Sequence, residues 1–450
     1  MRARLLITLG ALAVAWAAEH VLLPGIDAGR LESFFGQAGL APDTSSLNVV
    51  ALGLNPLMSA FLLVEVVALL VPRWRQLRAS RPGGRGALRR AGLAVTVVLA
   101  VVQAWFLARW LHRFPDPFAG GVLMAETGFG SHATVMLSLV GGTFFLIVVA
   151  ELIDRYGLGC GISCLLAGQG LRSLGPLVSA IGGLLEIGTI SGTDLVKQGA
   201  LVFALIGSAW WILTAHARNE PWRPRPLTSL RHPTSGIWPL TFAYAALALP
   251  AQLFAFGIDL GPLRHLSPDR QPYHFVYAGL ALVAGVLLTR LFYRRSLLLP
   301  VFRRLVEGAP ETDLAAPALL RRLMREGLTR TLIFLMVVTA LGSVMATSAV
   351  HLAPDPALVV VLTAVILDVG GEWRARWRQG KLIAVWPLNQ VALVQPATDA
   401  LARAGIVAWP RAAFHRSLLQ FFGPYIPVVL LVPEAQADEA RAKLEMILPS

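Results

Sequence analysis

The chain has 450 residues, of which 56% are hydrophobic and 14% are charged, and its mean hydropathy is +0.64. Soluble domains carry about 25% charged residues, so this composition excludes an ordinary soluble enzyme. The high apolar content excludes a disordered chain, and two cysteines exclude a disulfide scaffold. The remaining class is an all-α polytopic membrane protein, whose helices cross the bilayer several times.

The charge balance is strongly basic. Lys and Arg total 39 against 26 Asp and Glu, for a net charge of +13, and 36 of the 39 are Arg. A basic chain can bind nucleic acid. In a membrane protein the better interpretation is that Arg holds loops on the cytoplasmic side. We therefore expect a lipid bilayer around the protein and no nucleic-acid partner.

A helix crosses the hydrocarbon core with about 20 apolar residues, and the sequence contains ten runs of this kind. They lie at 5–23, 49–71, 93–111, 133–150, 161–181, 199–216, 235–256, 273–293, 329–350 and 358–371. The fifth, seventh and tenth runs are short or are broken by Gly or Pro. The sequence predicts ten transmembrane helices.

The Arg-rich loops predict the orientation. They lie at 72–92, 217–233 and 294–328, each after an even-numbered run. The loops after odd-numbered runs are poor in Arg and hold Asp27, Asp116, Asp194, Asp259 and Asp355. Because Lys and Arg are enriched on the cytoplasmic side, we predict a multi-pass protein with both termini in the cytoplasm.

The first apolar run has a second interpretation. Arg2 and Arg4 precede it, and Ala15–Trp16–Ala17 resembles the cleavage site of a secretory signal peptide. The run alone fits a cleaved signal and a retained helix equally well. The rest of the sequence favours a retained first helix.

From about residue 381 the pattern becomes that of a small soluble domain. Strand-like runs lie at Lys381–Leu388 and Ile426–Val432, and helical patterns lie at Ala392–Ala404 and Ala435–Leu448. Gly405 stands where a glycine commonly ends a helix. This order predicts a small C-terminal α+β domain over 381–450, which is cytoplasmic because the tenth run ends on that side.

The second and seventh runs open alike. Pro56-Leu-Met-Ser-Ala-Phe61 begins the second run, and Pro239-Leu-Thr-Phe-Ala-Tyr244 begins the seventh. The two positions are equivalent if the ten helices form two five-helix halves, and an odd number of helices inverts the second half. Inverted repeats also mark secondary transporters, so this pattern predicts a pathway without naming what passes through it.

No motif predicts an enzyme. The sequence has no nucleophile elbow, P-loop or HExxH motif, and its nine His residues are dispersed. Cys160 and Cys164 are four residues apart, but a metal site usually needs four ligands and no His is nearby. We predict packing roles for both cysteines, and no catalytic residue, metal or cofactor.

The most informative stretch is Glu151-Leu-Ile-Asp-Arg-Tyr-Gly-Leu-Gly-Cys-Gly-Ile-Ser163, between the fourth and fifth runs. Its glycines permit a tight turn, and alone it fits an ordinary Gly-rich hairpin equally well. The stretch resembles the second signature of the SecY family, the channel subunit of the protein translocase. It departs at Cys160, where the family has Asn, and at Asp154, where a hydroxyl or amide is usual. The matching residues are Glu151, Gly157, Gly159, Gly161 and Ser163.

Other motifs agree with this family in order, and the resemblance covers roughly residues 3–378. They are Pro24–Asp27, Ala51–Ala60, the Arg-rich turn with Gly84, Arg85, Arg89 and Arg90, then Ser235–Pro239 and Ala364–Asp368. The resemblance implies a channel domain over 1–378, with two inverted halves at about 1–190 and 191–378.

The resemblance also implies an hourglass channel closed by a ring of apolar side chains. Such a ring blocks ions by dewetting and can widen for an extended chain. Without the resemblance, ordinary helix packing is the better account of these positions, and Thr241 departs from the expected aliphatic residue. The ring positions are Met58, Leu62, Leu166, Thr241 and Val361.

Three departures bear on translocation. The segment Ala28–Val50, at the position of the family's plug helix, is short and lacks the Gly-rich plug motif. The loop 217–233 lacks the long basic hairpin that binds the ribosome and SecA. The loop 294–328 lacks the family's Pro-Gly-x-Arg-Pro-Gly segment. Three arginines supply positive charge there, namely Arg321, Arg322 and Arg325.

One ionisable residue lies inside a predicted span. Glu65 falls in the second run, where a charge costs several kcal/mol, at a position that is Gln-like in the family. Arg109 is a poor partner because it lies near the opposite membrane face. A structural and a functional role for Glu65 stay equally open, and a small-molecule transporter would rest on this residue alone.

The resemblance implies a SecY-like channel subunit in a bacterial cytoplasmic (inner) membrane, which translocates or inserts unfolded polypeptides and opens sideways between spans two and seven. A SecE-like subunit is the expected partner, while SecG-like and SecA-like partners stay open. The alternative is a SecY-fold scaffold or regulator that acts through its C-terminal domain. That domain resembles a small ferredoxin-like, signal-transducing domain, and an unrelated appendage fits it equally well.

Overall fold

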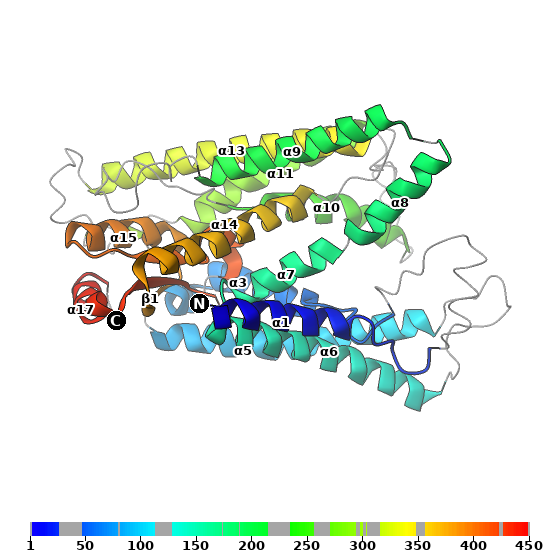
Figure 1. Cartoon of the computed structure of the whole chain (residues 1–450), viewed down its shortest axis with the longest axis horizontal. Coiled ribbons are helices and arrows are strands. Elements are labelled where there is room, and N and C mark those ends of the chain that lie inside the picture. Colours follow the sequence, from blue (N-terminus) through cyan, green and yellow to red (C-terminus); the bar gives the residue numbers. More distant parts are fainter. Residues whose placement is uncertain are drawn as a thin grey trace. The chain divides into compact units, whose positions relative to one another are not determined.

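The computed structural model describes residues 2–26, 47–79, 82–112, 128–172, 174–188, 190–214, 235–255, 271–293, 298–299, 303, 316–347, 356–422 and 426–448. Helices dominate these residues, and a small sheet lies toward the C-terminal end (Figure 1). Each of the ten predicted apolar runs falls on a helix, and the fifth run is divided between two helices.

The helices before the sheet are α1 (Arg2–Ala18), α3 (Asn55–Leu70), α4 (Pro72–Ala79), α5 (Pro82–Leu111), α6 (Phe129–Tyr156), α7 (Gly161–Arg172), α8 (Leu174–Glu186), α9 (Gly192–Thr214), α10 (Trp238–Ala255), α11 (Gln271–Phe292), α13 (Ala316–Thr347) and α14 (Pro356–Gln379). Within the described residues, five stretches are long and apolar enough to cross a membrane: Gly86–Leu111, Phe129–Tyr156, Gly192–Thr214, Pro272–Phe292 and Leu320–Met345. A mostly helical fold with membrane-length helices is confirmed. The count of ten spans stays a prediction.

The helices pack into two units, Met1–Arg172 and Ser173–Ser450. In the first unit, α5 packs on α3 and α6, and α1 packs on α6 and α7. In the second unit, α13 packs on both α9 and α11, α10 packs on α11, and α14 packs on α9. Figure 1 shows α9 and α13 lying side by side along nearly the same axis, with the chain running in opposite directions along them. The predicted halves and the predicted domain start at residue 381 stay predictions.

A short β-bridge between Leu22 and Asn48 joins the chain after α1 to the chain before α3. On either side of it, Leu23 N–H donates to the Leu47 carbonyl over 2.9 Å, and Val49 N–H donates to the Val21 carbonyl over 3.0 Å. Several sequence predictions fall outside the described residues. They are the segment Ala28–Val50 except its last four residues, the loop 217–233, most of the loop 294–328, and Asp27, Asp116, Asp259 and Asp355.

The C-terminal domain contains a three-stranded antiparallel sheet. Its strands are β1 (Leu382–Leu388), β2 (Trp409–Arg411) and β3 (Val428–Pro433), in the order β1-β3-β2. Its helices are α15 (Val394–Arg403), α16 (Ala413–Leu418) and α17 (Ala437–Ile447), with short 3-10 turns at Val391–Leu393, Gln420–Phe422 and Glu434–Gln436. Strand β3 lies between the two strands that α15 connects, which is a split βαβ arrangement.

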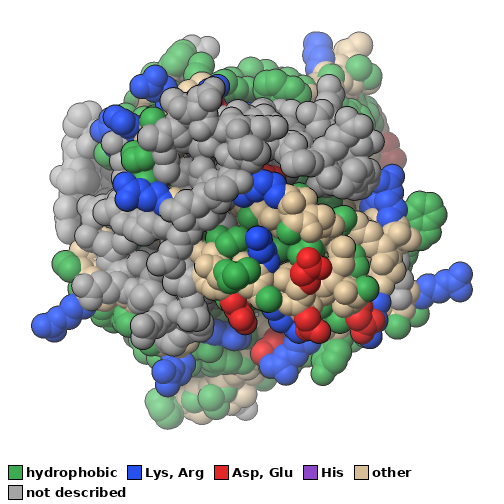
Figure 2. Space-filling view, turned by 90° about the vertical axis from the view of Figure 1, so that its left-hand side faces the viewer, with side chains coloured by type: hydrophobic (Ala, Val, Ile, Leu, Met, Phe, Trp, Pro, Cys, Tyr) green, Lys and Arg blue, Asp and Glu red, His purple; other side chains and the backbone are tan. Residues whose placement is uncertain are grey.

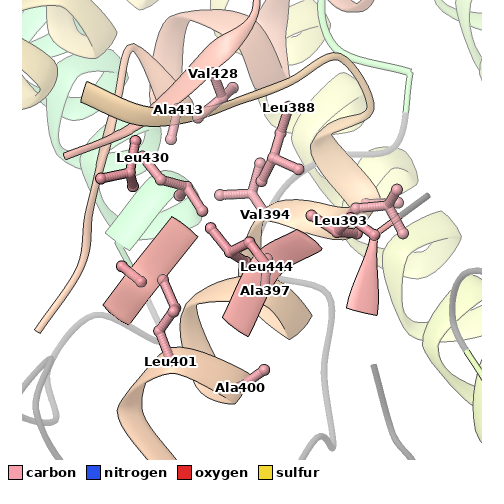
Figure 3. Packing of buried hydrophobic residues seen from close by; sticks show 14 of the residues in the cluster. Leu388, Leu393, Val394, Ala397, Ala400, Leu401, Ala413, Val428, Leu430 and Leu444 are labelled. Atoms are coloured by element: carbon pink, nitrogen blue, oxygen red, sulfur yellow. The ribbon is translucent and has the colours of Figure 1, made fainter. Parts of the chain in front are cut away.

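All four predicted elements of this domain are present. Gly405 adopts a left-handed φ of +76° after α15, which confirms it as the glycine that ends this helix. Leu388, Val394, Leu430 and Leu444 lie around a common core (Figure 3). Burial of such side chains contributes roughly 1.5–3 kcal/mol each. The ferredoxin-like assignment stays a prediction.

Two neighbouring glycines on α6 give a matched test of the packing in the first unit. A Cβ at Gly142 would overlap the main-chain carbonyl of Val49, whereas a Cβ at Gly141 meets no atom within 4 Å. We expect Gly142→Ala to lower the free energy of unfolding by about 1–3 kcal/mol, as overpacking does. Gly141→Ala should leave it unchanged or slightly higher. Thermal unfolding in detergent measures both, and equal melting temperatures would contradict this packing.

Candidate functional site

The signature stretch Glu151–Ser163 forms the end of α6, a turn and the start of α7. The N–H of Gly157 closes the last turn of α6, and Gly159 adopts a φ of +78°, which favours glycine. A Cβ at Gly161 would overlap the main-chain carbonyl of Ala150. The tight turn that the sequence predicts is confirmed, and it holds the start of α7 in backbone contact with α6.

Helix α1 binds this turn through two side chains. The N–H of Leu158 donates to Thr8 Oγ1 over 2.8 Å, and the Arg4 guanidinium donates to the Gly157 carbonyl over 3.2 Å. The Thr8 hydroxyl donates to the Arg4 carbonyl over 3.2 Å, and Thr8 is 5% exposed. Sequence reasoning missed Thr8, because the hydroxyl lies 150 residues before its partner.

The two departures from the signature pattern lie on either side of the turn, with Asp154 near the end of α6 and Cys160 directly before α7. Asp154 Oδ1 accepts the N–H of Gly161 over 2.7 Å at the start of α7, where a negative charge is favoured by the helix dipole. Cys160 and Cys164 are buried and form no disulfide. Burial raises the pKa of the Cys160 thiol, so this side chain stays protonated near neutral pH and acts as a packing residue.

Glu151, the acidic residue of the signature, lies on the surface of α6. Its Oε1 lies 2.6 Å from Arg155 Nη2 and 3.9 Å from Nη2 of Arg89 on α5. The structure therefore brings one predicted basic contact residue to the signature. All three side chains are well exposed, so each pair contributes about 0–1 kcal/mol.

The other predicted basic contacts lie elsewhere. Arg90 is exposed beside Arg89, and the side chain of Arg85 lies outside the described residues. Three arginines are exposed on the first turns of α13, and one of them, Arg322, contacts Glu326 over 3.1 Å. The three are Arg321, Arg322 and Arg325. Their use as a contact surface stays a prediction.

The predicted ring residues lie on four helices. Met58 and Leu62 are partly buried on α3, and Leu166 is partly buried on α7, all in the first unit. Thr241 is exposed on α10 and Val361 is buried on α14, both in the second unit. Their convergence into one constriction stays a prediction.

Glu65 is 1% exposed on α3 and has buried apolar neighbours along the helix, including Phe61 and Ala68. Arg109, in the last turn of α5, has its guanidinium carbon 5.2 Å from the centre of the Trp105 ring. The Arg109 charge therefore meets an aromatic face, which is a favourable cation–π contact.

A group of buried charges lies at the end of α14 and in β2 and α16, and of its members sequence reasoning noted only Asp368, as the end of the motif Ala364–Asp368. The Asp368 carboxylate accepts the N–H of Phe414 over 3.1 Å and the N–H of His415 over 2.8 Å. These bonds satisfy two amides at the start of α16. An amide that lost this acceptor would be left unsatisfied, at a cost of about 1–3 kcal/mol.

The Glu372 carboxylate is fully buried one turn further along α14. Its Oε1 lies 2.8 Å from Arg376 Nε, and its Oε2 lies 3.1 Å from Nε of Arg411 on β2. Arg376 also donates to the Leu382 carbonyl over 3.3 Å. Removal of one member of a buried ion pair costs about 3–5 kcal/mol, so this triad holds the sheet against α14.

A family model and several curated relatives match parts of this chain. The SecY family model matches residues 48–297. Among curated proteins, the translocase subunit SecY of Haemophilus influenzae is 30% identical over 215 residues, 46% of this chain and 48% of the relative. SecY of Escherichia coli K12 is 26% identical over 299 residues, 60% of this chain and 66% of the relative. The chain thus spans about half to two thirds of the length of these relatives.

Solved structures share the fold. A structure of SecY described for its plug domain has a TM-score of 0.55 at 14% identity, covering 84% of this chain and 94% of that one. A structure of a protein-conducting channel has a TM-score of 0.53 at the same identity and coverage. At this identity the likeness concerns the fold alone.

Thr8 and Thr134 give a matched test of the signature turn. Thr8→Val keeps the shape but removes the acceptor of Leu158 N–H, a buried group. We expect it to lower the free energy of unfolding by about 1–3 kcal/mol. Thr134→Val removes a hydroxyl that bonds only within α6, to the Gly130 carbonyl, and should change stability by less than about 0.5 kcal/mol. Chemical denaturation in detergent compares the two variants. Equal losses of stability would contradict the role of Thr8 in holding α1 to the signature turn.

His415 makes the C-terminal domain sensitive to acid. Burial, with the nearby Arg416 charge, lowers the pKa of its ring from 6.5 to about 3. Between these values the unfolded chain binds a proton and the folded chain does not. The contribution of His415 to stability is therefore full above pH 6.5 and falls by up to about 1.4 kcal/mol per pH unit below it.

Hydrogen exchange of the C-terminal domain between pH 7 and pH 4 measures this effect. We expect His415→Gln to flatten the pH dependence, and His20→Gln, at an exposed position after α1, to leave it unchanged. A wild-type slope in the His415 variant would show that another group causes the acid sensitivity.

Proposed function

The chain belongs to the SecY family, and from this premise we propose that it is the channel subunit of a protein translocase in a bacterial cytoplasmic membrane. The family match over residues 48–297 carries the proposal, because it runs through the signature turn and continues into α10 and α11 of the second unit. The fold shared with a protein-conducting channel supports it.

The proposed membrane topology has ten spans with both termini in the cytoplasm. Three runs are too short to cross a membrane as single described helices: α1 has 17 residues, α3 has 16, and the fifth run is divided between α7 with 12 and α8 with 13. Their positions in the order of the family motifs support counting them as spans. The exposed arginines at the start of α13, a helix end that this topology places in the cytoplasm, agree with the enrichment of Arg on that side.

The proposed pore lies between the two halves and opens sideways between α3 and α10. Its closed state has an apolar constriction, which blocks ions because water leaves a narrow apolar passage. The side chains proposed for this constriction come from both units. They are Met58, Leu62, Leu166, Thr241 and Val361.

The proposed substrate is an unfolded or nascent polypeptide, and the proposed stable partner is a SecE-like subunit. Both extend to this chain the description of its relatives as subunits of a protein translocase. SecG-like and SecA-like partners are left open, because the family's long basic hairpin is missing from the loop 217–233.

The comparisons do not favour the second candidate, a SecY-fold scaffold that has lost translocation. A small-molecule transporter would need a working charge in the pathway, and Glu65 is the residue available for that role. Glu65→Gln keeps the shape of the side chain and tests this alternative.

In-cell photocrosslinking tests the channel. A crosslinker at Leu62 or Thr241 should form adducts with many exported or membrane proteins, and these adducts should disappear when secretion is blocked. The adjacent positions Leu63 and Phe242 are matched controls, because successive residues of a helix point about 100° apart and both side chains are exposed on α3 and α10. Adducts with lipid or one fixed partner at all four positions would reject the polypeptide channel.

A further inference from the structure

The C-terminal domain touches the start of α10 directly. The N–H of Ile237 donates to the Leu418 carbonyl at the end of α16 over 3.0 Å. Gly236 adopts a left-handed φ of +60°, and a Cβ there would overlap the Leu418 carbonyl. The peptide that precedes α10 is therefore packed backbone against backbone on α16.

Apolar side chains continue this contact. Leu418 is fully buried in the cluster that contains Leu240 and Ala243 of α10 and Ala364 of α14, and Phe414 packs against the same cluster. Helix α16 thus belongs to the core of the membrane helices as well as to the C-terminal domain. It contacts the residue before α10 at one end and packs along α14.

The start of α16 is fixed to α14 by the Asp368 carboxylate, and β2 is fixed to α14 by the Glu372 triad. Buried Arg416 donates to the carbonyls of Leu419 and Asn389, so it ties α16 to the turn after β1. A movement of the sheet relative to α14 would break buried charged contacts, which makes the connection stiff.

A second contact joins the domain to α11 and α13. Tyr293, Leu298 and Leu320 lie in the same hydrophobic cluster as the core of the sheet. They follow the end of α11 and begin α13. The domain is therefore packed against four helices of the second unit, α10, α11, α13 and α14, and is no loose appendage.

The described outward side of α17 carries charges of both signs. Helix α17 carries Asp438, Glu439 and Glu445 together with Arg441 and Lys443. Figure 2 shows Asp and Glu side chains gathered on one part of this end of the protein, with Lys and Arg around them. A surface with charges of both signs does not predict binding to a polyanion such as RNA. The contacts that the structure shows for the domain are those with the helices of the second unit.

We propose that the C-terminal domain positions the gate helix, holding the first turn of α10 through α16 so that sideways opening of the channel requires the domain to move with α10 or to release it. The proposal rests on the proposed channel function, because sideways opening is a property of a channel. The contact between domain and helix is tested separately from that function.

Gly371 and Gly370 on α14 give a matched pair of variants. A Cβ at Gly371 would overlap the Trp409 ring of β2, whereas a Cβ at Gly370 meets no atom within 4 Å. Gly371→Leu should wedge the sheet away from α14, and Gly370→Leu adds the same side chain one residue away without touching the domain. Asp368→Asn is a milder second variant, which keeps the volume and replaces one of the two oxygens that accept the amides of α16 by an NH2 group, which donates.

Two spin-label distances in the full-length protein test the proposal. One reports whether the domain stays in place, and the other reports whether α10 moves. Labels at Arg321→Cys and Met446→Cys, both exposed, measure the domain against α13. Labels at Phe203→Cys and Tyr244→Cys, both exposed, measure α10 against α9. The native Cys160 and Cys164 are buried, so labelling at the introduced positions is selective. Ion conductance across a planar bilayer reports opening.

In Gly371→Leu and Asp368→Asn we expect the first distance to broaden, the second to shift, and conductance to rise about tenfold or more, since each variant disturbs a buried contact that holds the domain on α14. Gly370→Leu should match the wild type in all three measurements. A shift of both distances without conductance would support the positioning role and count against the channel function.

Two results would overturn the proposal. One is release of the domain with no change in the α9–α10 distance, because α10 would then be held by other contacts. The other is an unchanged first distance in both folded variants, because the contacts at Asp368 and Gly371 would then not hold the domain.

Discussion

Both units depend on places where main chains meet without a side chain between them. In the first unit Gly142 meets the chain before α3, and Gly161 meets α6; in the second unit Gly236 meets the end of α16. In a membrane protein lipid is as apolar as the helices, so close van der Waals packing drives association where burial from water does not. Glycine permits this close approach because it has no side chain. The contacts lie on α6, at the start of α7 and directly before α10, which are elements of the proposed channel.

Buried charges make this packing specific to one arrangement. The desolvation of Glu372 and its two arginines costs nearly as much as their attraction returns, so such a triad contributes little net stability. It does penalise any arrangement in which one member lacks its partners. The same reasoning applies to the Asp368 carboxylate, which accepts two amides of α16. These contacts select one position of the C-terminal domain on α14.

Much of the fold was predictable because long apolar runs identify helices regardless of their neighbours. The structure extends α5 and α13 before the predicted runs, since Arg and Ala favour helix and end the apolar pattern without ending the helix. Strand β2 and helix α16 were missed because they have three and six residues, and Pro410 argues against a strand. The signature turn was predictable from its glycines. Its partner Thr8 and the buried charges were not, because long-range contacts leave no local pattern.

The bridge between Leu22 and Asn48 has a consequence for how this protein can change over evolutionary time. It pins the two ends of residues 27–46 to each other independently of what lies between them. For a loop with fixed ends, each doubling of length costs only about 0.6 kcal/mol of closure entropy. The length of chain between the two ends of this bridge can therefore change at little cost in closure entropy, while the surrounding helices keep their packing.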